Sequence, residues 1–191
     1  MEKILVSLEF TPNPNTLKYL INRSFLSQGA ANFRNRNEAE QKSPLAVKLF
    51  SIPGIEGVMV GRNFVTVTKA EDGDWDEVHQ KCSAIIETHL TDGLPVLTDA
   101  ALKELNETPK NAGSGSDRIV TRIREILDQE IRPAVAMDGG DIVFESYKDG
   151  IVYLHLQGAC AGCPGATMTL KMGVENRLRE AIPEVKEVVS V

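Results

Sequence analysis

The chain has 191 residues, of which 42% are hydrophobic and 25% are charged, and its formal net charge is −6. This composition is typical of a globular protein with one large domain or two small ones. No apolar run is long enough to span a membrane, and acidic residues outnumber basic ones in both halves, which argues against a membrane protein and a nucleic-acid-binding surface.

The cysteine count and the first residues indicate the cellular compartment. Three cysteines, an odd number, give no disulfide framework and suit a reducing compartment. Residues 1–6 contain an acidic residue and alternate as a strand does, which fits neither a signal peptide nor an arginine-rich transit peptide. We therefore expect a bacterial cytoplasmic protein, or a mitochondrial matrix protein if the chain is a processed form.

The first part of the chain predicts an α+β domain over residues 1–105. Segments in which apolar and polar residues alternate, as in strands, are interspersed with segments of helical periodicity. In chain order the expected elements are a strand around 3–9, a turn over 11–15, a strand near 16–21, a helix opened by Ser43-Pro44, a hairpin with strands near 55–60 and 64–69, a helix over 74–91 and a short helix near 98–105.

Residues 106–116 have the composition of a linker. They contain no aliphatic side chain larger than alanine and end in the run Gly113-Ser114-Gly115-Ser116. Such segments are typical of flexible tethers, so two small domains are expected on either side.

A second α+β domain is predicted over residues 117–191. In chain order its expected elements are a helix capped by Ser116 or Asp117 and ending by Pro133, a turn at 138–141, strands at 142–147 and 151–157 joined by 148–150, a helix over 166–182 and a final strand at 185–190. The two domains show no close internal repeat.

Two of the three cysteines, Cys160 and Cys163, lie three residues apart between the predicted strand and the predicted helix. The second one lies near the positive end of that helix, which favours a thiolate, and glycine and alanine leave the backbone bare on both sides. A zinc ion or an iron-sulfur cluster normally takes four protein ligands. A chain that offers two must obtain two more, and a second copy is the obvious source.

Other candidate ligands have simpler explanations. Cys82 lies on an apolar helical stripe with Trp75 and Ile86, so we expect a core thiol. His155 falls on the strand face opposite Leu154 and is expected to be exposed or between domains, with a ligand role as the alternative. His79 and His89 are predicted on a helix surface.

Two loops also invite a functional interpretation. Asp138-Gly139-Gly140-Asp141 offers two carboxylates for a cation, but carboxylates among glycines most often form a turn. Thr11-Pro12-Asn13-Pro14-Asn15 predicts a rigid proline turn.

The residues by themselves leave three classes of function open. The cysteine pair suits a metal-cluster carrier, a thiol–disulfide oxidoreductase, or a structural zinc site shared by two chains. The oxidoreductase is disfavoured because Pro164 follows the second cysteine and the chain lacks a thioredoxin-type βαβ pattern before it. A cysteine hydrolase is hard to support, because His155 alone could serve as the base.

Several motifs resemble a known family. Met137-Asp138-Gly139-Gly140-Asp141, the segment Gly158-Ala159-Cys160-Ala161-Gly162-Cys163-Pro164 and the helix residues Met168-Thr169-Leu170-Lys171 resemble the C-terminal domain of NifU-type iron-sulfur scaffold proteins. The stretch Thr11-Pro12-Asn13-Pro14-Asn15-Thr16-Leu17-Lys18 and the segment Ile52-Pro53-Gly54-Ile55-Glu56-Gly57-Val58 resemble the N-terminal domain of the Nfu branch.

The resemblance implies a non-enzymatic carrier that binds a 4Fe-4S cluster between two protomers, with Cys160 and Cys163 as ligands. Its implied partners are a second copy in the cluster-bound form, apo iron-sulfur target proteins and an upstream cluster donor. It also makes the turn at residues 11–15 a candidate partner surface. The N-terminal domain is then expected to dock on target proteins. The chain lacks the separate scaffold and ferredoxin domains of full-length NifU, so late-acting transfer is the expectation.

Overall fold

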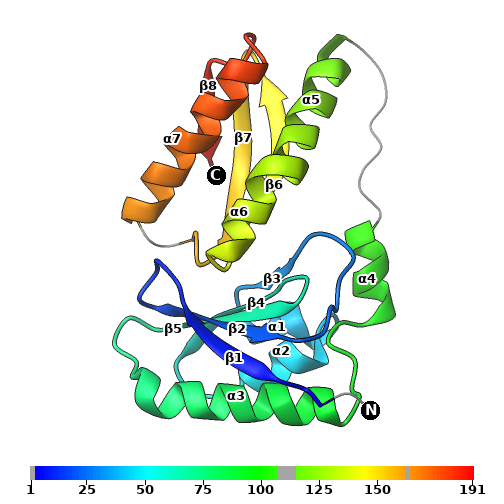
Figure 1. The fold of residues 1–191 in the computed structure, drawn as a ribbon, viewed down its shortest axis with the longest axis vertical. Helices are drawn as coiled ribbons and strands as arrows, with labels where there is room; N and C mark the ends of the chain where they lie inside the picture. Colours follow the sequence, from blue (N-terminus) through cyan, green and yellow to red (C-terminus); the bar gives the residue numbers. More distant parts are fainter. Residues whose placement is uncertain (1–2, 107–114, 162–163) are drawn as a thin grey trace. The chain divides into compact units, whose positions relative to one another are not determined.

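The computed structural model describes residues 3–106, 115–161 and 164–191, and the chain divides into two compact units, Met1–Thr108 and Pro109–Val191 (Figure 1). Each unit combines helices with a β-sheet, which confirms the predicted α+β class with two domains. Residues 107–114 of the predicted linker lie outside the described residues.

The first unit is built on an antiparallel sheet with the strand order β1-β2-β5-β4-β3. Its strands are β1 (Val6–Phe10), β2 (Thr16–Ile21), β3 (Ala31–Phe33), β4 (Ile55–Val60) and β5 (Phe64–Lys69). The bounds of β2, β4 and β5 agree with the prediction, whereas β1 begins three residues later. Strand β3 was not predicted, because three residues are too few to show an alternating pattern.

Helices cover one face of this sheet (Figure 1). They are α1 (Arg36–Glu40), α2 (Pro44–Leu49) and α3 (Trp75–Thr91), and α4 (Asp99–Asn106) follows. Ser43 caps α2 as expected: its hydroxyl accepts a hydrogen bond from the Ala46 amide at 3.0 Å and donates to the Val96 carbonyl at 2.7 Å. The short helix α1 was not predicted.

His89 is fully buried in the last turn of α3, so its predicted place on the helix surface is wrong. The chain folds back after α3, and Val96 and Leu97 join the core of this unit. The Nε2 atom of His89 donates to the Pro95 carbonyl at 3.0 Å. The spacing of apolar residues along the helix carries no information about this returning segment, so the sequence did not predict the burial of His89.

The second unit packs two helical segments on one face of the sheet β6-β7-β8 (Figure 1). Strands β6 (Gly140–Lys148) and β7 (Ile151–Gly158) are antiparallel, and β8 (Glu187–Ser190) runs parallel to β7. The first helical segment consists of α5 (Gly115–Ile126), η1 (Leu127–Ile131) and α6 (Arg132–Met137), which follow one another without a break. The second is α7 (Pro164–Ala181). Leu154, Ile126 and Leu178 are among the residues that form the core between them.

The first helix of this unit does not end by Pro133 as predicted. It continues through the π-helical segment η1 into α6 and ends at Met137. Proline has no N–H for an i→i−4 hydrogen bond, and its ring clashes with the preceding turn of a regular helix. A π-helical turn just before Pro133 changes the hydrogen-bond register locally, and the helical path continues.

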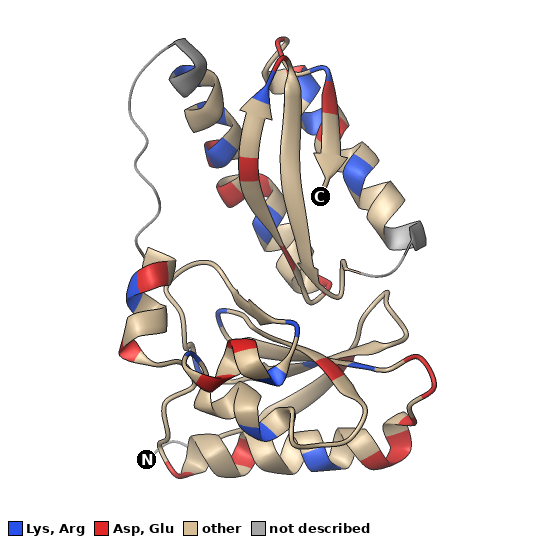
Figure 2. Cartoon of the chain, turned by 180° about the vertical axis from the view of Figure 1, so that it is seen from behind, with Lys and Arg blue, Asp and Glu red and all other residues tan. Residues whose placement is uncertain are grey.

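Basic and acidic residues are interspersed along both units (Figure 2). In the portion of the chain that the structure describes, no helix is both long enough and apolar enough to cross a membrane.

Candidate functional site

Cys160 lies in the turn that follows β7 and precedes α7. The turn is fastened on two sides: the Ala159 amide donates to the Gly139 carbonyl at 3.1 Å, and the Thr167 hydroxyl donates to the Cys160 carbonyl at 3.1 Å. Gly158 has a φ of +62°, a value that favours glycine. The turn is therefore held between the α6–β6 junction and the first part of α7.

The thiol of Cys160 is buried, with 8% of the residue exposed, and it belongs to the core of the second unit. The pKa of Cys160 is raised to about 11, chiefly by burial, and the nearby carboxylates of Asp138 and Asp141 contribute to this rise. The sequence predicted a loop whose bare backbone allows close approach to the sulfurs, whereas the Cys160 thiol is packed in the core. Cys163, for which the thiolate was predicted, lies outside the described residues.

Gly140 explains how a sulfur atom fits there. A Cβ atom added at Gly140 would overlap the Cys160 Sγ atom, and it would lie 3.2 Å from Cys160 Cβ and 3.1 Å from Val135 Cγ1. The space beside the Gly140 backbone is therefore occupied by the thiol. Sequence reasoning assigned this glycine only to a turn, because its neighbour across the space is twenty residues away in the chain.

The predicted turn forms at Asp138 and Gly139, and the next two residues, Gly140 and Asp141, already belong to β6. Asp138 is the C-cap residue of α6, and Gly139 has a φ of +78°. Asp141 is 5% exposed, and both of its carboxylate oxygens accept from Arg132, from Nε at 2.8 Å and from Nη2 at 2.7 Å. Since these oxygens already have a cationic partner, the structure favours the turn over a cation site.

Arg132, which binds Asp141 near the start of β6, was not predicted as a residue of this site. It lies at the start of α6 and also donates from Nη1 to Asp128 at 3.0 Å. The hydrogen bonds to Asp141 are the largest cause that raises its pKa, so its charge is secure. No sequence signal pairs Arg132 with Asp141, because the contact arises from the turn of the chain between α6 and β6.

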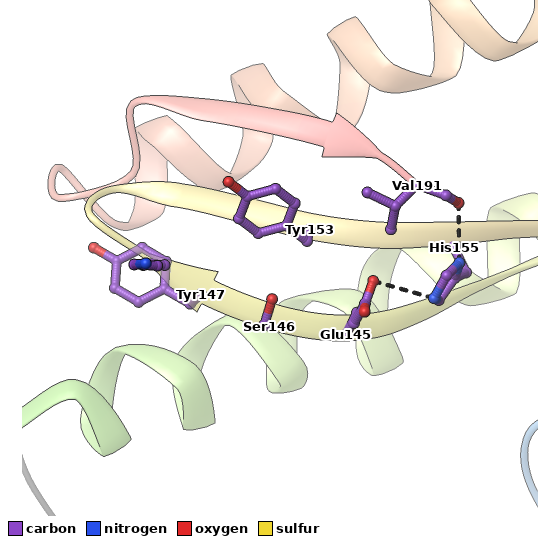
Figure 3. A pocket seen from close by; sticks show the side chains of 7 residues that line it. Glu145, Ser146, Tyr147, Tyr153, His155 and Val191 are labelled. Atoms are coloured by element: carbon purple, nitrogen blue, oxygen red, sulfur yellow. Dashed lines mark hydrogen bonds and ion pairs between the residues drawn. The ribbon is translucent and has the colours of Figure 1, made fainter.

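His155 lies on the sheet face opposite the helices, in a shallow hollow that it lines with Glu145, Tyr153 and Val191 (Figure 3). Its Nδ1 atom is 2.9 Å from the Val191 carbonyl oxygen, and its Nε2 atom is 3.1 Å from Glu145 Oε2. Cys160 packs into the core on the other face, so the structure does not bring His155 and Cys160 together.

The remaining candidates behave as structural residues. Cys82 is fully buried in the core of the first unit, as predicted, and burial raises its pKa to about 11. The predicted turn forms at residues 11–15 and is held by side-chain contacts: the Trp75 indole donates to the Pro14 carbonyl at 2.9 Å, and Lys69 Nζ lies 3.1 Å from Asn15 Oδ1. His79 is half-buried on α3. Among the residues described, no group of three or more His, Cys, Asp or Glu side chains could hold a metal ion.

Each unit corresponds to a known domain. The family model described as "NifU-like domain" matches residues 123–189, and the one described as "Scaffold protein Nfu/NifU N terminal" matches residues 6–93. The fold and the position of the cysteine turn therefore define a two-domain protein of the NifU-like class.

Relatives identify the branch. The protein named "NFU1 iron-sulfur cluster scaffold homolog, mitochondrial" of Drosophila erecta is 41% identical over 189 residues, covering 98% of this chain and 65% of its own length. Its human namesake is 40% identical over 191 residues, covering 98% of this chain and 72% of its own length. The chain belongs to the Nfu family, and it spans about 65% of the length of the first of these relatives.

A solved structure is also similar. The solution structure of a NifU-like protein from Saccharomyces cerevisiae is 26% identical, covers 50% of this chain and 86% of its own, and has a TM-score of 0.46.

Proposed function

We propose that this chain is a carrier that binds a 4Fe-4S cluster between two copies and transfers it to apo-proteins, without catalysing a reaction of its own. The observation that carries the proposal is the likeness to proteins named iron-sulfur cluster scaffold homologues over 98% of this chain. The cysteine turn of the NifU-like domain supports it, because Cys160 and Cys163 have the spacing of cluster ligands.

In this proposal the ligand number determines the assembly. A cluster of this type takes four thiolates, and one chain supplies Cys160 and Cys163, so a second copy supplies the other two. Since the thiolate is the ligand and the pKa of Cys160 is about 11, binding displaces a proton from this thiol. When the cluster leaves, Cys160 can return to its buried, protonated state. Such reversible binding suits a carrier, which has to release the cluster that it binds.

The implied partners are an upstream cluster donor and apo iron-sulfur target proteins. We place the chain in a reducing compartment, since its relatives are named mitochondrial and its cysteines form no disulfide framework.

The test is anaerobic reconstitution with iron and sulfide, followed by metal analysis, Mössbauer spectroscopy and analytical ultracentrifugation. We expect one 4Fe-4S cluster per two chains, with the cluster-bound form dimeric and the metal-free form monomeric at micromolar concentration. A stable monomer carrying a full cluster would contradict the shared site. Zinc at one ion per two chains that iron and sulfide do not displace would identify the structural zinc site instead.

A further inference from the structure

Gly139, Gly140 and Gly158 lie beside the Cys160 turn, and their backbone conformations set one of them apart. Gly139 and Gly158 have φ values of +78° and +62°, which side-chain-bearing residues rarely adopt. Gly140 has no positive φ, so its backbone alone does not require glycine. What excludes a side chain at this position is the Cys160 Sγ atom, which a Cβ atom would overlap.

The thiol thus lies in a slot formed by the Gly140 backbone and the Val135 side chain, which is itself 3% exposed in the core. A thiolate–metal bond is about 2.3 Å long, so the metal must touch the sulfur. A cluster that also binds a second chain has no access to a sulfur atom packed in this way. The buried position and the ligand position are therefore two different positions of the same side chain.

We propose that Gly140 is a positioning residue for Cys160: it leaves a slot that shields the thiol, and the Cys160 side chain rotates out of this slot to bind a cluster. The ligand role of Cys160 rests on the proposed function, whereas the slot and the shielding rest on the packing alone. A shielded thiol reacts slowly with oxidants and stray metals, so the slot protects the ligand between rounds of transfer.

The variant Gly140→Ala tests the slot directly, because a methyl group fills it and the backbone tolerates alanine. Gly173→Ala is the matched control, since a Cβ atom at Gly173 in α7 meets nothing within 4 Å. Both are made in a Cys163→Ser background under reducing conditions, and alkylation of Cys160 by iodoacetamide is followed by peptide mass spectrometry. Cys82 lies in a different tryptic peptide.

We expect Cys160 to be alkylated about tenfold faster, or more, in Gly140→Ala than in the parent, and at the parent rate in Gly173→Ala. Adding Val135→Ala to Gly140→Ala makes room for the thiol again and should bring the rate back toward that of the parent. Equal rates in Gly140→Ala and the parent would overturn the proposal.

Low urea concentrations separate a local effect from unfolding. Alkylation through side-chain rotation depends little on urea, whereas alkylation through global unfolding rises steeply with it. A rate in Gly140→Ala that rises steeply with urea would show that the variant merely unfolds, and it would overturn the proposal.

A final arm separates this inference from the proposed function. With Cys163 restored, Gly140→Ala should take up iron and sulfide at least as fast as the natural sequence, whereas a purely structural defect would slow uptake. If alkylation responds as expected but no variant binds a cluster, the slot stands and the carrier function fails. If all variants bind a cluster but alkylation does not respond, the carrier stands and the slot fails.

Discussion

At the scale of single residues, the two described cysteines are both buried thiols in different cores. Cys82 is fully buried in the first unit, and burial is the largest cause that raises its pKa to about 11, with a hydrogen bond from Tyr19 acting against it. Cys160 has a similarly raised pKa, but it lies in the turn after β7, and its thiol occupies the slot beside Gly140. The two thiols therefore have similarly raised pKa values, although one lies in a helix and the other in a turn.

Cys82→Ala should destabilise the first unit by about 1–2 kcal/mol, since a small buried side chain is truncated. Trp75, the single tryptophan of the chain, belongs to this unit, so its fluorescence during urea unfolding reports the change. Iron content after reconstitution should stay at the level of the natural sequence. A loss of iron in Cys82→Ala would contradict its assignment to the core.

Cys160→Ser should lose the cluster and also destabilise the second unit by about 1–2 kcal/mol, because a hydroxyl without a designed partner would replace a thiol in the core. Cys160→Ala should lose the cluster at a smaller cost in stability. Unfolding by urea followed by circular dichroism, together with iron analysis, checks both; equal iron in Cys160→Ser and the natural sequence would refute the ligand assignment.

His89 predicts a pH dependence of stability. Its pKa is lowered from the ordinary 6.5, chiefly by burial, and Lys48 lowers it further, while the Pro95 hydrogen bond and Asp92 act against this. The folded chain therefore binds a proton at His89 less readily than the unfolded chain. Stability from this group is complete above the ordinary pKa and is lost as the pH falls below it.

We expect the free energy of unfolding of the first unit, followed by Trp75 fluorescence, to fall between about pH 7.5 and about pH 5. His89→Gln, which can still donate to the Pro95 carbonyl, should flatten this dependence. His79→Gln on the same helix is the control and should preserve it. An unchanged slope in His89→Gln would show that other groups cause the effect.

At the scale of elements, the junction from η1 through α6 to β6 supports the cysteine turn. Arg132 at the start of α6 binds Asp141 near the start of β6 through two hydrogen bonds. The Arg132 side chain is 26% exposed and that of Asp141 is 7% exposed. Removing the arginine leaves a nearly buried carboxylate without its partner, which is costly in a protein interior.

Arg132→Ala should therefore destabilise the second unit by about 2–3 kcal/mol. Arg132→Lys should recover only part of this, because an ammonium group cannot bind both oxygens as a planar guanidinium does. Arg122→Ala, which removes an exposed ion pair with Glu125 on α5, is the control and should cost less than about 1 kcal/mol. Urea unfolding followed by circular dichroism measures all three; equal losses in Arg132→Ala and Arg122→Ala would contradict the importance of the junction.

At the scale of the whole molecule, two units with separate cores suggest a division of labour. In our proposal the second unit binds the cluster and the first docks on target proteins. The composition of residues 106–116 predicts a tether with a root-mean-square reach of roughly 16–20 Å, so a docked first unit keeps the cluster at a high effective concentration near the target.

The intact chain should then activate an apo 4Fe-4S enzyme faster than residues 117–191 alone at low micromolar concentration. The difference should disappear as the concentration rises, because mass action replaces proximity. Adding the two domains as separate pieces is the control and should behave as the second domain alone. Three coincident activation curves at low concentration would show that the first unit does not target the cluster.

The sequence by itself determined the elements whose signal is local. Alternation predicted β2 and the β4–β5 hairpin with their observed bounds, Ser43-Pro44 predicted the start of α2, and the spacing of Cys160 and Cys163 marked the candidate site. These patterns reflect the conformational preferences of residues that are neighbours in the sequence, and such preferences do not depend on tertiary packing.

Only the tertiary structure decided what surrounds these elements. The burial of His89 depends on a returning segment, and the shielding of Cys160 depends on Gly140, twenty residues earlier in the chain. The helix continues past Pro133 through the π-helical segment η1, and the pairing of Arg132 with Asp141 arises because the chain turns between α6 and β6. Burial and ion pairing depend on segments that the fold brings together, and no local pattern records which segments will meet.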